Sequence, residues 1–198
     1  DDCCDDFNQL LNYLNLNKIN LCGYSMGGRL AISFAKKHPN KINSLFLEST
    51  SFGLKNEEDR NKRIKSDQII SDNILNNFSK TMIEWSHKPL FSSQKIRNKT
   101  EWDKQLNQRL MHKKRQLSKS LKVFSLGKMH YYRNDIRKFT FPIIIINGFE
   151  DKKFIEIGKD LLSLNRNSKH YIVPESNHNI HMENNNEFVK ILRKNYHE

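Results

Sequence analysis

The feature that most constrains the fold is a serine flanked by glycines in residues 23–28, Gly-Tyr-Ser-Met-Gly-Gly. This motif fits the pattern G-x-S-x-G. A short apolar run, residues 19–22, precedes it, and a helical pattern over residues 30–37 follows it. The context predicts a strand, a sharp turn and a helix, with glycine on both sides of the serine because side chains there would clash. The serine hydroxyl would then project from the strand end, beside a helix N-terminus that stabilises negative charge.

The outer parts of the sequence alternate between strand-like and helix-like patterns. Apolar runs of strand length cover residues 19–22, 42–47, 141–147 and 170–173. Patterns with helical spacing cover residues 7–14, 30–37, 154–164 and 187–195. This alternation is typical of the α/β class, in which helices cover both faces of a mostly parallel sheet.

The middle of the sequence has a different character. Residues 52–139 contain one proline, Pro89, and no strong strand pattern, and their apolar residues recur at spacings of three and four. We interpret this segment as an inserted helical cap. The sequence therefore predicts three blocks: a first part of the core over 1–51, the cap over 52–139, and a second part of the core over 140–198.

The formal net charge of +12 comes from the cap segment. Residues 52–139 hold about 21 Lys and Arg against about 9 Asp and Glu, whereas the rest of the chain is balanced. A bias toward Lys, Asn and Ile codons would also raise the number of lysines. Nucleic-acid binding through the cap would predict an affinity that falls steeply with salt. Because the segment lacks any recognised binding motif, we expect no nucleic-acid partner.

Several classes of protein are excluded by composition. The longest apolar run, residues 143–146, is far shorter than the ~20 residues that cross a bilayer, so we expect no membrane span. We expect no secretory signal, because the chain opens with acidic residues and cysteines. Three cysteines at no zinc-like spacing favour a reducing compartment and a cytoplasmic location. No metal-ligand cluster or phosphate loop appears, so we expect no metal and no organic cofactor, and nothing assigns an oligomeric state.

A serine in this turn requires an acid, and then a histidine, later in the chain. The acid should follow a late strand, and Asp151 follows the strand pattern over 141–147. Glu150 is the competing carboxylate, but Asp151 lies at the more usual distance after the strand. We therefore predict that Asp151 is the acid that pairs with the histidine.

The histidine should follow the last strand, and His178 follows the pattern over 170–173. His181 competes with it, although a surface or substrate-binding role suits His181 better. The sequence thus predicts a catalytic group of Ser25, Asp151 and His178.

Four stretches carry a resemblance to a known family. They are residues 23–29 (Gly-Tyr-Ser-Met-Gly-Gly-Arg), 47–54 (Leu-Glu-Ser-Thr-Ser-Phe-Gly-Leu), Trp85 with 89–94 (Pro-Leu-Phe-Ser-Ser-Gln), and 148–154 (Gly-Phe-Glu-Asp-Lys-Lys-Phe). Over nearly its whole length the chain resembles the α/β-hydrolase fold, and within it the 2-succinyl-6-hydroxy-2,4-cyclohexadiene-1-carboxylate synthases of menaquinone biosynthesis. The first stretch is shared by the whole superfamily, and the second and third are much more specific.

The resemblance implies a lyase rather than a hydrolase. Enzymes of this kind eliminate pyruvate from 2-succinyl-5-enolpyruvyl-6-hydroxy-3-cyclohexene-1-carboxylate. The serine, assisted by histidine and aspartate, removes a proton from the substrate ring, so no acyl-enzyme forms. Serine at its free pKa is a poor base, so the histidine must take up its proton. The backbone N–H of Met26 would stabilise the developing oxyanion.

The resemblance also implies a small polycarboxylate substrate, which arginine forks would match bidentately. Arg29, Arg63 and Arg109 stand where the family places its substrate-binding arginines. Arg60 or Arg115 could replace the cap arginines, and a solvated helix face is the alternative for either position. Tyr24 and Trp85 match positions of the family's pocket, although aromatic residues in a cap are often simply packed.

Two departures from the family pattern stand out. Ser25 lies near the start of the sequence, whereas in the family four strands precede it. The resemblance therefore implies an α/β-hydrolase fold that lacks its first strands, together with the His-Gly loop that supplies a second oxyanion donor. The chain would then be a fragment or an inactive protein. In addition, Asn177 precedes His178 where the family has glycine, and asparagine tolerates the left-handed conformation.

Two alternative functions remain. A serine hydrolase acting on a small ester or thioester would share the same three residues, but it would show a burst with activated esters. A non-catalytic relic or binding module is favoured by the missing strands, whereas the complete set of Ser25, Asp151 and His178 argues against it.

Overall fold

The computed structural model describes residues 2–196. The chain divides into two compact units, of which the first joins Asp1–Phe52 to Tyr132–Glu198 and the second is Gly53–Tyr131. Residues 132–139, assigned to the cap from the sequence, fall in the first unit and include helix α8 (Arg133–Ile136). The backbone N–H of Tyr132 donates to the carbonyl of Phe52, which joins the two ends of the first unit.

The first unit is built on a parallel four-stranded sheet. Its strands are β1 (Ile19–Tyr24), β2 (Ile42–Glu48), β3 (Ile143–Gly148) and β4 (Ser168–Val173), and their spatial order is β1-β2-β3-β4. All three neighbouring pairs are parallel. The predicted α/β class is confirmed, and each predicted strand is present with its ends moved by a few residues.

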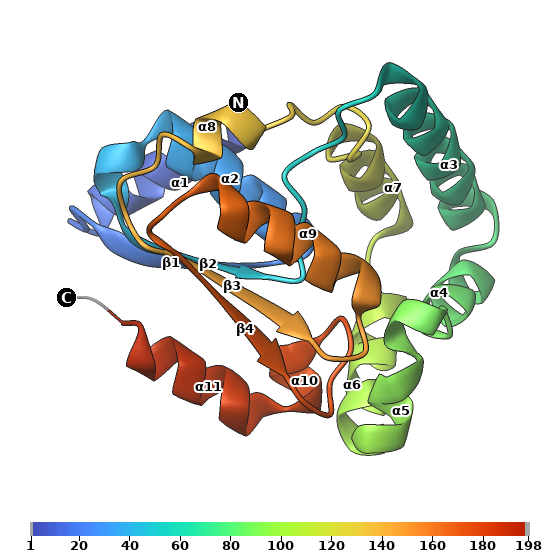
Figure 1. The fold of residues 1–198 in the computed structure, drawn as a ribbon. Helices are drawn as coiled ribbons and strands as arrows, with labels where there is room; N and C mark the ends of the chain where they lie inside the picture. Colours follow the sequence, from blue (N-terminus) through green and yellow to red (C-terminus); the bar gives the residue numbers. More distant parts are fainter. Residues whose placement is uncertain (1, 197–198) are drawn as a thin grey trace. The chain divides into compact units, whose positions relative to one another are not determined.

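Helices cover both faces of this sheet. The helices are α1 (Asp2–Tyr13), α2 (Met26–Lys37), α9 (Lys152–Leu164), α10 (Ile180–Glu183) and α11 (Asn185–Lys194). Figure 1 shows α2 and α9 on one face and α11 on the other. This explains why residues 143–146 form a continuous apolar run, because β3 is buried on both faces.

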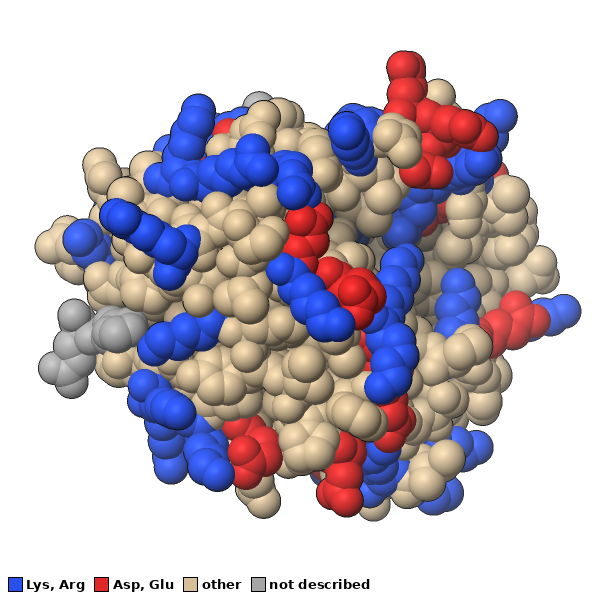
Figure 2. Space-filling view, viewed as in Figure 1, with Lys and Arg blue, Asp and Glu red and all other residues tan. Residues whose placement is uncertain are grey.

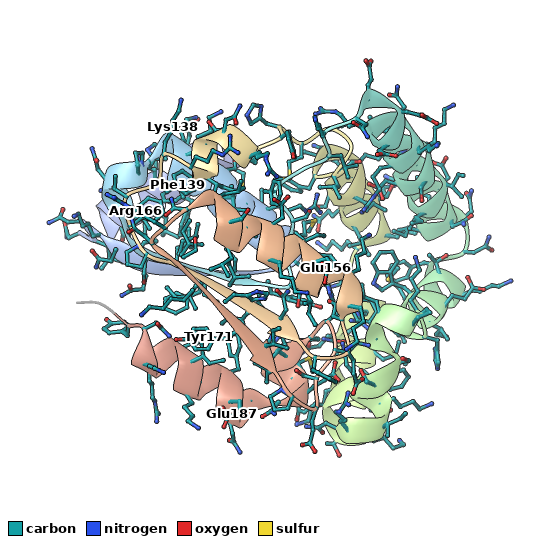
Figure 3. The ribbon with its side chains drawn as sticks, viewed as in Figure 1. Lys138, Phe139, Glu156, Arg166, Tyr171 and Glu187 are labelled. Atoms are coloured by element: carbon teal, nitrogen blue, oxygen red, sulfur yellow. The ribbon has the colours of Figure 1, made fainter. Side chains whose placement is uncertain are left out.

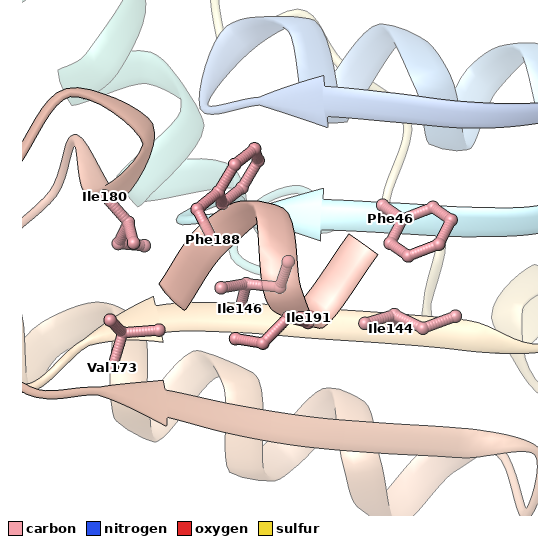
Figure 4. Packing of buried hydrophobic residues seen from close by; sticks show 7 residues of the cluster. All are labelled: Phe46, Ile144, Ile146, Val173, Ile180, Phe188 and Ile191. Carbon is pink, nitrogen blue, oxygen red and sulfur yellow. The ribbon is translucent and has the colours of Figure 1, made fainter. Parts of the chain in front are cut away.

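The face beneath α11 holds a well-defined core. Its members come from three strands and from α10 and α11 (Figure 4): Phe46, Ile144, Ile146, Val173, Ile180, Phe188 and Ile191. Tyr171, labelled in Figure 3, projects from β4 against this cluster, and its hydroxyl donates to the side chain of Asn195 at 3.3 Å. This packing fixes both ends of the segment between β4 and α11, which contains His178.

The described residues of the second unit are helical, as the sequence predicts. Its longer helices are α3 (Glu57–Asn76), α4 (Phe78–Ser86), α5 (Ser92–Arg97), α6 (Lys99–Leu110) and α7 (Lys114–Val123). Helix α3 packs along α7, where the buried hydroxyls of Ser71 and Ser118 lie 2.6 Å apart and Ser71 also donates to the Ser118 carbonyl. Asp and Glu in the first turn of α3 complement its dipole.

On the face drawn in Figure 2, the basic residues do not form one uninterrupted field. Figure 2 shows Lys and Arg side chains mixed with Asp and Glu over the visible face. In the second unit, many of the lysines pair with acidic residues one helical turn away, among them Lys62 with Glu58 and Lys99 with Asp103. These pairs are typical of solvated helix faces and contribute little to stability.

Residues 2–196 show neither a membrane-spanning helix nor a cluster of metal ligands. No helix in this part of the chain has the length and apolar character needed to cross a membrane. The same residues hold no group of three or more His, Cys, Asp or Glu side chains placed to bind a metal ion.

Candidate active site

The site is centred on Ser25, which occupies the turn between β1 and α2. Its backbone has φ 48° and ψ −107°, a conformation that residues other than glycine rarely adopt and that costs about 1–3 kcal/mol. Its N–H donates to the carbonyl of Glu48 at 2.8 Å, and its carbonyl accepts the Thr50 hydroxyl at 2.6 Å. The end of β2 and the residues after it therefore hold the serine in a strained conformation.

The glycines around Ser25 have different roles. A Cβ on Gly23 would lie 2.6 Å from the carbonyl oxygen of Gly27, and a Cβ on Gly28 would lie 2.6 Å from Cβ of Thr50. A Cβ on Gly27 would meet no heavy atom within 4 Å. The expectation that side chains would clash on both sides of the serine therefore holds for Gly23 and is wrong for Gly27.

Ser25, His178 and Asp151 form one hydrogen-bonded chain. The Ser25 hydroxyl lies 3.0 Å from Nε2 of His178, and Nδ1 of His178 lies 2.7 Å from Oδ2 of Asp151. Because an ionised carboxylate only accepts, Nδ1 carries the hydrogen, which leaves the Nε2 lone pair facing the serine hydroxyl. The three side chains thus have the arrangement in which a histidine can take a proton from the serine.

The surroundings of His178 fix its ring. His178 is 1% exposed and Asp151 is 4% exposed, so water has little access to their hydrogen bond. The ring of Phe154 lies 4.6 Å from that of His178, centroid to centroid, and the ring of Tyr24 lies 5.4 Å away. Asp151 directly precedes α9, whose N-terminal dipole stabilises its negative charge.

The loop before His178 relies on a glycine from another segment. A Cβ on Gly148, at the end of β3, would lie 2.0 Å from the carbonyl oxygen of Asn177. Asn177 itself is not among the described residues with positive φ, whereas Glu175, two residues earlier, has φ 51°. The left-handed position in this loop is therefore Glu175.

The two competing residues from the sequence lie outside this hydrogen-bonded chain. Glu150 is exposed, and its N–H donates to the carbonyl of Ser176. His181 is bonded to Glu48 through Nδ1, at 2.8 Å from Oε2 and 3.0 Å from Oε1. Sequence reasoning missed Glu48. Its signal was a charged residue directly after the apolar residues 45–47 at the end of a strand.

The remaining predicted residues of the first unit are close to Ser25 in the chain. Tyr24 ends β1, and Met26 begins α2. The Met26 N–H belongs to the first turn of a helix, where N–H groups have no partner within the helix. Arg29 lies one turn along α2 and is partly buried, and its N–H donates to the Ser25 carbonyl at 3.3 Å.

The second unit holds Arg63 and Trp85 near a shared lysine. Nε of Arg63 donates to both carboxylate oxygens of buried Asp67, at 2.8 and 2.9 Å. The Lys88 ammonium lies 4.1 Å from the centroid of the Trp85 ring. Burial, and next the positive charge of Arg63, lower the pKa of Lys88. Within its own unit, Arg63 is therefore a fixed cation and not a freely solvated side chain.

Arg109 belongs to the same group of side chains. Its Nη1 donates to the hydroxyl of buried Ser86 at 2.8 Å, and its guanidinium carbon lies 5.2 Å from the centroid of the Phe91 ring. The Phe91 ring is in turn 6.4 Å from the Trp85 ring. The structure thus gathers Arg63, Trp85 and Arg109 in one part of the second unit.

Arg60 and Arg115, the alternative cap arginines, have other settings. Arg60 lines a hollow of about 550 Å³ within the second unit, together with Lys55 and Lys128. Arg115 is exposed in the first turn of α7. Among the described residues, neither of these two arginines has a contact with Trp85 or Phe91 like those described above for Lys88 and Arg109.

The fold and the motif agree with a known family. The sequence matches the α/β-hydrolase fold family over residues 1–185. The chain belongs to this family. It is 34% identical to a protein of Bacillus subtilis (strain 168) provisionally named 2-succinyl-6-hydroxy-2,4-cyclohexadiene-1-carboxylate synthase, over 94% of this chain and 69% of that protein. It is 28% identical to the synthase of that name from Enterobacter sp. (strain 638), over 88% of this chain and 65% of that protein.

Solved structures extend the comparison. The structure of MenH from S. aureus superposes with a TM-score of 0.89 at 29% identity and covers 97% of this chain and 74% of that one. A thermophilic esterase from Thermogutta terrifontis has a TM-score of 0.81 at 20% identity, over 96% of this chain and 69% of that one, a likeness of fold alone. The chain thus spans about two thirds of the length of its curated relatives.

Proposed function

We propose that the protein is a carbon–oxygen lyase of menaquinone biosynthesis, a 2-succinyl-6-hydroxy-2,4-cyclohexadiene-1-carboxylate synthase. The observation that supports this best is the hydrogen-bonded chain from Ser25 through His178 to Asp151, with Ser25 in a strained turn. The names of the relatives from Bacillus and Enterobacter supply the reaction.

In the proposed reaction, His178 removes the proton from the Ser25 hydroxyl as that oxygen takes a proton from the substrate ring. The electron pair of the broken C–H bond forms a ring double bond, and the C–O bond to the enolpyruvyl group breaks. The leaving enolate takes up the proton that the His178 imidazolium gives back, which restores the neutral histidine, and departs as pyruvate. Asp151 holds the His178 tautomer and stabilises its positive charge, so no covalent intermediate is needed.

The proposal assigns the binding of the anionic substrate to the arginines. The Met26 N–H would stabilise the developing oxyanion, and Arg29 would bind a carboxylate near Ser25. Arg63 and Arg109 are proposed to bind further carboxylates, beside Trp85. Support comes from their chemistry and their ordered settings, because a guanidinium that is already fixed loses less entropy when it binds. A small-molecule substrate in a cytoplasmic protein is part of the same proposal.

The test is pyruvate release from 2-succinyl-5-enolpyruvyl-6-hydroxy-3-cyclohexene-1-carboxylate, followed with a lactate dehydrogenase coupling assay. We expect release by the purified protein and a loss of about three orders of magnitude or more in Ser25→Ala. A matched control, Ser163→Ala, removes a serine hydroxyl that bonds only locally on α9.

A parallel assay with p-nitrophenyl acetate tests the alternative function. Ester cleavage with a burst that depends on Ser25, without any pyruvate release, would replace the lyase with a serine hydrolase. Absence of both activities would favour a non-catalytic binding module.

A further inference from the structure

A second acid–histidine pair lies beside the proposed catalytic group. Glu48 is the last residue of β2, and its side chain is 1% exposed. Its carboxylate accepts two N–H groups of His181: the backbone N–H at 3.0 Å and the ring Nδ1–H, 2.8 Å from Oε2.

Glu48 is also bonded to the serine turn. Its backbone carbonyl accepts the N–H of Ser25 at 2.8 Å. His181 lies three residues after His178, at the start of α10. Glu48 therefore holds the backbone of Ser25 with its main-chain carbonyl, and its side chain holds the segment that carries His178.

The ring of Tyr24 lies next to the rings of both His178 and His181. The centroid of its ring lies 5.4 Å from that of His178 and 5.1 Å from that of His181. The His181 ring also lies 5.9 Å from Phe188, a member of the core beneath α11. A change in the orientation of the His181 ring would therefore displace the Tyr24 ring, which packs against His178.

A buried carboxylate in this position requires compensation. Moving a carboxylate out of water is costly unless hydrogen bonds or a cation replace its hydration. Desolvation, and next the negative charge of Glu48, raise the pKa of the Cys22 thiol on the neighbouring strand to about 11. His181 supplies hydrogen bonds that replace part of the hydration lost by the buried carboxylate of Glu48.

We propose that Glu48, acting through His181, is a positioning residue that fixes the distance between the Ser25 hydroxyl and Nε2 of His178. This inference rests on the proposed roles of Ser25 and His178. It adds that the distance between them depends on a hydrogen-bonded bridge from β2 to α10 as well as on the Asp151 contact. Breaking this bridge would make the position of His178 less fixed, without removing any group that touches substrate.

The main variant is Glu48→Gln, which keeps the size of the side chain and one acceptor for the His181 backbone N–H. Its amide nitrogen cannot accept from Nδ1–H, so the ring keeps at most the 3.0 Å contact with the remaining oxygen and is held less firmly. We expect kcat for pyruvate release to fall about tenfold or more, since displacement of a reacting group by about 1 Å can cost 100-fold, while KM changes by less than about twofold. A residue that only stabilised the fold would not lower kcat while leaving KM nearly unchanged.

Two substitutions at His181 separate positioning from substrate binding. His181→Asn keeps a side-chain N–H near the place of Nδ1, whereas His181→Ala removes it. If Glu48 acts through His181, His181→Ala should lose activity and His181→Asn should recover a large part of kcat. Equal losses in both variants, with a raised KM, would overturn the proposal and make His181 a substrate-binding residue.

The control for stability is Asp160→Asn, which breaks the ion pair with Arg133, 2.6 Å long, elsewhere in the same unit. Thermal midpoints of all variants identify those that are merely less stable. An unchanged kcat in Glu48→Gln would overturn the proposal.

Labelling of Ser25 by a fluorophosphonate separates this inference from the proposed function, because labelling needs an activated serine but not the natural substrate. Labelling that slows in Glu48→Gln supports positioning even if the protein releases no pyruvate, a result that would overturn only the lyase. A protein that neither releases pyruvate nor labels at Ser25 would overturn both, because it would then have no reactive serine to position.

Discussion

The two glycines that flank Ser25 provide the sharpest test of how this turn is built. A methyl group on residue 23 would lie 2.6 Å from the Gly27 carbonyl oxygen and 2.6 Å from Cα of Gly28. Ordinary contact between such atoms begins near 3.4 Å, so β1 and α2 must separate by about 0.8 Å. Both obstructing atoms belong to the backbone, and no side-chain rotation can relieve the overlap.

The expected cost of Gly23→Ala follows from this displacement. Overpacking typically destabilises by about 1–3 kcal/mol, and we expect a loss near 3 kcal/mol because the obstacle is backbone. Moving Ser25 by nearly 1 Å should also lower kcat about 100-fold. Urea unfolding measures the first effect, and the pyruvate assay measures the second.

Gly27→Ala is the matched control, because it adds the same methyl group four residues away. A Cβ there meets nothing within 4 Å, and the residue lies in the first turn of α2. We expect unchanged stability or a gain of about 0.5–1 kcal/mol from helix propensity. Equal destabilisation by the two substitutions, or a stable Gly23→Ala, would refute the steric reasoning.

Three further predictions concern other parts of the first unit. Asp151→Asn should leave the protein folded and lower kcat by about three to four orders of magnitude. The reason is that His178 loses the tautomer that accepts a hydrogen bond from Ser25. Near-normal turnover would contradict this prediction. Burial, and next the charge of Lys159, lower the pKa of His170. Below about pH 6.5 the unfolded chain therefore binds a proton at this residue more readily than the folded chain does, and the free energy of unfolding should fall as the pH drops. The thermal midpoint of His170→Asn should change less than that of the wild type between pH 7 and pH 5, and equal slopes would exclude this group as the cause. Cys22 is exposed, yet desolvation of its sulfur, and next the charge of Glu48, raise its pKa to about 11. In a Cys3→Ser, Cys4→Ser background it should therefore react slowly with a disulfide reagent at pH 8 and faster in Glu48→Gln; fast reaction of the parent would contradict the assignment.

Much of the first unit was predictable because its signals are local. Each strand contains a short apolar stretch, and Ser25, Asp151 and His178 each follow one in the order that the motif requires. The start of α2 was harder to predict, because Gly27 and Gly28 are poor helix formers although the helix already begins at Met26. Residues 132–139 were assigned to the cap because apolar spacing does not reveal that Tyr132 bonds to Phe52.

The parts that sequence reasoning missed depend on contacts between distant segments. Glu48 and His181 lie 133 residues apart in the chain, and nothing at either position indicates the other. The close approach of Gly28 to Thr50, and of Gly148 to Asn177, is likewise invisible in the sequence. The arginines of the cap could be selected only by resemblance, because helical register alone does not separate Arg63 from Arg60.

The central claim is that Ser25 acts as a base and forms no covalent intermediate. A single-turnover experiment with substrate deuterated at the ring carbon that loses its proton tests this claim most directly, with intact-protein mass spectra taken at the same times. The account predicts slower pyruvate release from the deuterated substrate and a protein mass that does not change. Equal rates for the two substrates, together with a substrate-derived mass on Ser25, would contradict it.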